Sequence, residues 1–66
     1  MKPLAEYRRT IEREAQFVGV KPYSHNIIGL CLESIDKYYG TIEANKAIKD
    51  FNLEDHGWSL VKLDGE

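Results

Sequence analysis

The sequence has little that would tie a small chain together covalently. Cys31 is the only cysteine among 66 residues, so a disulfide within one chain is excluded. A lone cysteine among apolar helical residues is typical of a reducing compartment, and we expect a cytoplasmic protein. A chain of this size buries only about 60 % of its unfolded surface, so domains of this kind often gain stability from a partner or a second copy.

Long apolar runs are also missing. No stretch approaches the ~20 residues that span a bilayer, and charged residues interrupt the first twenty positions, unlike a signal peptide. The chain has no internal repeat, low-complexity segment or linker, which predicts a single domain over 1–66. We therefore expect a soluble protein with no membrane partner.

Signatures of catalysis and of metal binding are absent as well. The sequence has no GxSxG motif, P-loop or glycine-rich phosphate loop, and Cys31 lies within an apolar helical stripe. His25, Cys31 and His56 have neither the i, i+4 nor the CxxC spacing of metal ligands. We expect no catalytic residue, no metal, no cofactor and no enzymatic activity.

What the chain does have is apolar periodicity of the helical kind. Between Leu4 and Val18, apolar residues recur at steps of three or four, which predicts a helix over about 3–18. Pro3 suits the first helical position, and Gly19 suits a left-handed residue that ends the helix.

A second helix is predicted over 24–39, with Ser24 as its N-cap. Tyr23 and Ile28 have the spacing of a hydrophobic staple around that cap. The apolar face of this segment is wide, which indicates a central helix with neighbours on two sides. Its opposite face is a polar strip that consists of Asn26, Gly29, Glu33 and Asp36.

A third helix is predicted over 42–51, with Thr41 as its N-cap and Asn52 in the left-handed conformation at its end. Lys46 and Asp50 have the i, i+4 spacing of an ion pair.

The tail, 53–66, is predicted to start with a short turn that ends at Gly57 and to continue without a helix. The residues from Trp58 to Leu63 favour an extended form, but one strand cannot form a sheet. We therefore expect Trp58 and Leu60 to cover the helices, and the last three residues to fray. The predicted fold is all-α: a three-helix small domain with a short extended or irregular C-terminal tail.

Charge is unevenly distributed along the chain. Residues 1–23 carry five basic and three acidic side chains, whereas 24–66 carry four basic and eight acidic ones. This asymmetry could bring copies together or orient a partner. It does not resemble the basic surface of a nucleic-acid-binding protein, and the third helix, tested as a recognition helix, would present charges of both signs. DNA binding is retained only as a further alternative.

The densest group of polar side chains surrounds the start of the second predicted helix. Helix N-termini offer unpaired N–H groups and a positive dipole end to anions, so a ligand or partner could bind there. Glycine inside a helix costs about 1 kcal/mol relative to alanine, but it lets a ligand or partner approach closely. The alternative is structural, with a cap, a staple and solvated first-turn residues. The candidate residues are Lys21, Ser24, His25, Asn26 and Gly29.

Large aromatic side chains are numerous for so small a domain, with four tyrosines and one tryptophan. Tyrosine and tryptophan suit interfaces because they combine an apolar body with a polar tip. The alternative is that they build the core. The candidate interface residues are Tyr38, Tyr39, Trp58 and Leu60.

Two stretches carry a resemblance to known proteins: 22–28, which reads Pro-Tyr-Ser-His-Asn-Ile-Ile, and 44–58, from Ala-Asn-Lys-Ala-Ile through Phe51 to Gly57-Trp58. Over 22–58 the chain resembles small uncharacterised helical proteins encoded by phages and prophages. The resemblance implies a stoichiometric binding role and no site residues.

These observations favour a non-catalytic small binding protein that acts on a protein partner or on itself as a homo-oligomer. The alternative is the binding of a small anion or a nucleotide at the N-terminus of the second helix.

Overall fold

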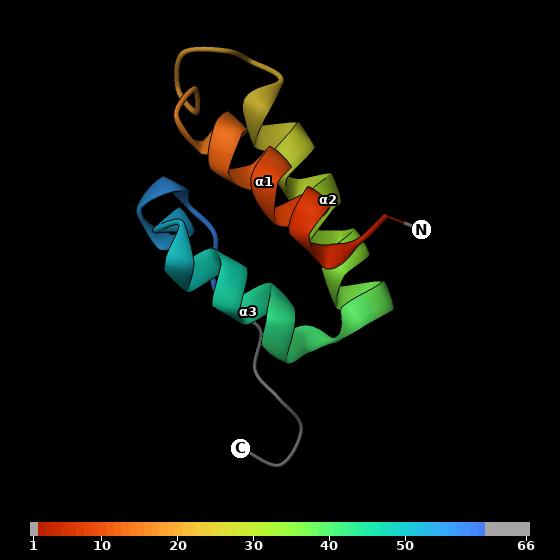
Figure 1. The fold of residues 1–66 in the computed structure, drawn as a ribbon. Coiled ribbons are helices and arrows are strands. Elements are labelled where there is room, and N and C mark those ends of the chain that lie inside the picture. Colours follow the sequence, from red (N-terminus) through yellow and green to blue (C-terminus); the bar gives the residue numbers. More distant parts are fainter. Residues whose placement is uncertain (1, 61–66) are drawn as a thin grey trace.

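The computed structural model describes residues 2–60 and shows an all-α fold (Figure 1). Helix α1 spans Leu4–Ala15, α2 spans Ser24–Tyr39 and α3 spans Thr41–Asp50, and a short 3-10 helix, η1, spans Leu53–His56. The part of the chain that is described contains no strand. The predicted three-helix fold is confirmed, whereas the predictions for 61–66 lie outside the described residues.

Helix α2 is central, as its wide apolar face predicts. It packs against both α1 and α3, and α1 runs antiparallel to it (Figure 1). No helix within residues 2–60 has both the length and the apolar character needed to cross a bilayer. The buried core draws on all three helices and on η1, through Ile11, Ile28, Leu32, Ile35, Ala44, Ala47, Ile48 and Leu53.

Helix α1 is shorter than the predicted 3–18. Pro3 has extended backbone angles and is the N-cap rather than the first helical residue. At the other end the chain tightens into turns after Ala15, in which Phe17 donates to the carbonyl of Glu14 at 2.9 Å. These tighter turns reverse the chain before α2, while Val18 still packs against the core.

Helix α2 has the predicted bounds, but Ser24 is not its N-cap. The N-cap is Tyr23, and the Ser24 N–H donates to the carbonyl of Lys21 at 3.3 Å. The Ser24 hydroxyl donates instead to Oε1 of Glu14 on α1 at 2.9 Å. The predicted staple is also wrong, because Tyr23 is 73 % exposed. The buried contact with α1 therefore replaces local capping.

The junction between α2 and α3 is a single glycine. Gly40 has a φ of 102° and a ψ of 161°, which residues with a side chain rarely adopt, and it is both the C-cap of α2 and the N-cap of α3. Thr41 is consequently the first residue of α3 and not its N-cap. Its hydroxyl donates to Oδ1 of Asp36 at 2.6 Å and so joins the two helices.

Helix α3 begins and ends one residue earlier than the predicted 42–51, but the residue that turns the chain after it is the predicted one. Asn52 has a φ of 55° and a ψ of 37°, which is the predicted left-handed conformation. The predicted pair of Lys46 with Asp50 is wrong. The Nζ of Lys46 lies 3.7 Å from Oε2 of Glu43. Asp50 pairs instead with Arg8, because the packing of α1 brings this guanidinium to the end of α3.

Candidate functional site

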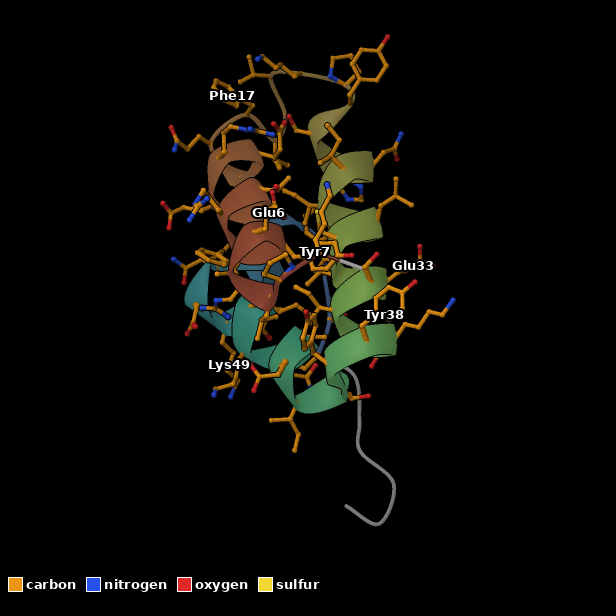
Figure 2. All side chains as sticks on the ribbon, turned by 45° about the vertical axis from the view of Figure 1, so that its right-hand side comes forward. Glu6, Tyr7, Phe17, Glu33, Tyr38 and Lys49 are labelled. Atoms are coloured by element: carbon orange, nitrogen blue, oxygen red, sulfur yellow. The ribbon has the colours of Figure 1, made fainter. Side chains whose placement is uncertain are left out.

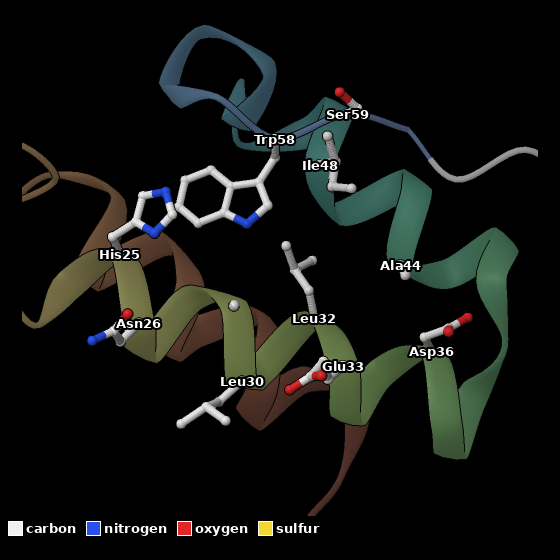
Figure 3. A pocket seen from close by; sticks show the side chains of 11 residues that line it. His25, Asn26, Leu30, Leu32, Glu33, Asp36, Ala44, Ile48, Trp58 and Ser59 are labelled. Atoms are coloured by element: carbon white, nitrogen blue, oxygen red, sulfur yellow. The ribbon is translucent and has the colours of Figure 1, made fainter.

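A groove lies between α2, α3 and the segment that follows η1 (Figure 3). Its volume is about 680 Å³, and it is open to solvent along one side. Leu32, Ala44 and Ile48 belong both to its lining and to the core, so the base of the groove is apolar. Such a surface can hold an apolar side chain of a ligand or partner.

Trp58 forms the wall opposite α2. Its indole stacks on the imidazole of His25, with ring centroids 4.2 Å apart and an interplanar angle of 20° (Figure 3). Gly57, with a φ of 105°, turns the chain, and the Trp58 N–H then donates to the carbonyl of Leu53 at 3.2 Å. Trp58 also packs against the core, so the predicted covering of the helices is confirmed.

Two carboxylates lie along the α2 side of the groove, at Glu33 and Asp36 (Figure 3). Oδ1 of Asp36 accepts the hydrogen bond from Thr41, and neither carboxylate is in an ion pair within residues 2–60. Among residues 2–60, no lysine or arginine lines the groove. This edge, the acidic rim, therefore favours positive charge.

Gly29 lies on the same wall, one helical turn before Glu33. No heavy atom of the described chain lies within 4 Å of the position that a Cβ would take there, apart from the glycine's chain neighbours and the helix backbone around it. Nothing in the packing of residues 2–60 therefore requires glycine at this position. Its lack of a side chain leaves room for an occupant to approach the α2 backbone.

The structure brings together three of the five residues predicted at the start of α2. His25 and Asn26 line the groove (Figure 3), and so does Gly29. Ser24 is fully buried and faces Glu14, and the Nζ of Lys21 lies 4.1 Å from the centre of the Phe17 ring. The hydroxyl and the ammonium that an anion site would use are thus engaged elsewhere.

The contact of Ser24 with Glu14 has an electrostatic consequence. The hydrogen bond from Ser24 lowers the pKa of Glu14 below its ordinary value, burial opposes this shift, and Arg13 adds to it through a hydrogen bond and its charge. Ser24 therefore helps to hold α2 against α1, and its role is structural.

Three of the four predicted interface residues make contacts within the chain. Tyr39, Trp58 and Leu60 pack against the core, and the Tyr39 hydroxyl donates to the carbonyl of Lys2 at 2.7 Å. Tyr38 is 46 % exposed and points away from the helices (Figure 2). Leu30 at the edge of the groove is 63 % exposed.

The site prediction omitted several residues that line the groove. Glu33 and Asp36 follow Gly29 at steps of four and three, so their place on the polar strip of α2 could have predicted that they lie on the same wall as Gly29. No signal in the sequence places α3 and the segment after η1 opposite this strip. The omitted lining residues are Leu30, Leu32, Glu33, Asp36, Ala44, Ile48 and Ser59.

Cys31 is half-buried at the edge of the core. Burial raises the pKa of its thiol, which disfavours the thiolate that a nucleophile or a metal ligand needs. Residues 2–60 contain no group of three or more histidine, cysteine or carboxylate side chains arranged to hold a metal ion.

Comparisons with protein-family models, with curated proteins and with solved structures gave no match.

Proposed function

We propose that this protein is a non-catalytic binding protein that acts stoichiometrically on a protein partner, and that the groove takes a short segment of that partner. The observation that carries this proposal is the groove itself. It combines an apolar base, an aromatic wall at Trp58 and an unobstructed stretch of helix at Gly29.

The open shape of the groove favours a protein segment over a small metabolite. Sites for small molecules bury most of the ligand surface, whereas this groove leaves one side open to solvent. A peptide segment can anchor one side chain on Leu32 and Ile48 and leave its remaining surface outside.

The test is a selection from a random dodecapeptide display library on the immobilised protein. Selected peptides are then measured by calorimetry against the wild type, Gly29→Gln and Glu12→Gln. Glutamine at position 29 suits a helix and places a side chain at the wall of the groove, while Glu12 is an exposed residue of α1 away from it.

We expect peptides that bind the wild type and Glu12→Gln equally and lose at least tenfold in affinity for Gly29→Gln. A selection without enriched peptides would contradict the proposal. So would peptides that bind all three proteins equally.

A further inference from the structure

We infer that the partner segment is cationic: it sets an apolar side chain on the base of the groove and a lysine or arginine against the acidic rim formed by Glu33 and Asp36. This inference rests on the proposed function and names the chemistry of its partner.

The charges around the groove carry the inference. Glu33 and Asp36 line it, and the one other titratable side chain that lines it within residues 2–60 is His25. Lys37 lies beside both rim carboxylates in a second hollow of the surface, but its Nζ is 5.5 Å from the centre of the Tyr38 ring and is in no ion pair with either of them. Within residues 2–60 the rim carboxylates therefore have no ion-pair partner, and a cation from a partner segment would complement them.

The cost of covering the groove supports the same conclusion. A wholly apolar segment would remove water from Glu33 and Asp36 without replacing its hydrogen bonds, which is unfavourable. An acidic segment would add repulsion. A basic segment offers N–H donors that pair with both carboxylates and can stay partly in water.

The spacing of the lining residues sets the pattern of the segment. From Leu32 in the base of the groove to Asp36 the axis of α2 advances about 6 Å at a rise of 1.5 Å per residue. An apolar anchor on the base would therefore be followed by a cation about one helical turn away, or about two residues away in an extended segment.

The composition of the peptides that depend on Gly29 is the first test. We expect an excess of lysine and arginine over aspartate and glutamate relative to the library, together with an apolar anchor. Peptides with no charge bias, or with an acidic bias, would overturn the inference and leave the proposed function standing. If no peptide depends on Gly29, the proposed function fails, and the inference fails with it.

The second test is a double variant, Glu33→Gln with Asp36→Asn. Asparagine keeps an oxygen that can accept the hydrogen bond from Thr41, so the junction of α2 and α3 is retained. Because exposed ion pairs contribute modestly, we expect the selected basic peptides to bind roughly 2- to 30-fold more weakly, with less dependence on salt. Unchanged affinity in the double variant would overturn the inference, and Glu12→Gln, which removes a carboxylate away from the groove, is the control.

Discussion

Gly29 lies in the interior of α2, where glycine is unfavourable and where the packing of residues 2–60 does not need it. We predict that Gly29→Ala raises the free energy of unfolding by about 0.5–1 kcal/mol, because alanine restricts the unfolded chain and meets no obstacle in the fold. Urea unfolding followed by circular dichroism measures this change. A lower free energy of unfolding for Gly29→Ala would contradict this prediction.

Glu14 is a second residue with a measurable consequence, because its side chain is only 12 % exposed and accepts the hydrogen bond from Ser24. Its pKa in the folded protein lies below the ordinary value of 4.5, so its contribution to stability is present above that pH. The contribution is lost as the pH falls through the lowered pKa.

We therefore predict that wild-type stability falls more steeply below about pH 4.5 than that of Glu14→Gln, which has no such group to protonate. Urea unfolding at a series of pH values tests this prediction. Ser24→Ala should lessen the difference by removing the main cause of the shift, whereas parallel curves for wild type and Glu14→Gln would contradict it.

At the scale of elements, the turn that follows α3 places a residue other than glycine, Asn52, in the left-handed conformation. Asn52 adopts a φ of 55°, which is less costly for asparagine than for most residues with a side chain. We predict that Asn52→Ala lowers the free energy of unfolding by about 1 kcal/mol and that Asn52→Gly does not. Lys49→Ala, on the exposed side of α3, is the control in the same urea unfolding measurement.

The helical spans could be predicted from the sequence because apolar periodicity reports directly on which face is buried. Helix starts were less predictable. Ser24 and Thr41 have the side chains of N-caps, but each hydroxyl donates to a carboxylate, on α1 and on α2 respectively. Local rules cannot choose between a cap and a tertiary partner of similar energy.

The candidate site, too, could be predicted only in part from the sequence. The polar strip of α2, with Gly29 within it, was visible in the sequence, and it forms one wall of the groove. The opposite wall could not be predicted, because the position of Trp58 depends on the turns at Asn52 and Gly57 and on where α3 packs. The groove is thus a product of tertiary structure.

At the scale of the whole molecule, two long-range contacts join segments that lie far apart in the sequence. Arg8 of α1 pairs with Asp50, and its guanidinium lies 5.1 Å from the centre of the Phe51 ring. Tyr39 at the end of α2 binds the carbonyl of Lys2. The first contact connects α1 to the end of α3, and the second connects the segment before α1 to the end of α2.

The homo-oligomer stays a prediction. Val20, Leu30 and Ile42 are 77 %, 63 % and 61 % exposed, which leaves apolar surface for a second copy. Light scattering after size-exclusion chromatography should give a mass above the 7.6 kDa of one chain, increasing with concentration. A mass of one chain at every concentration would contradict it.

Trp58 is the only tryptophan of the chain, and it stands in the groove with its indole on His25. The intrinsic fluorescence of the protein at wavelengths selective for tryptophan therefore comes from one position. Any occupant of the groove would change the solvent around that indole and so its emission. Tryptophan fluorescence can therefore report binding in the groove without an added label, because the emitting side chain is part of the groove wall.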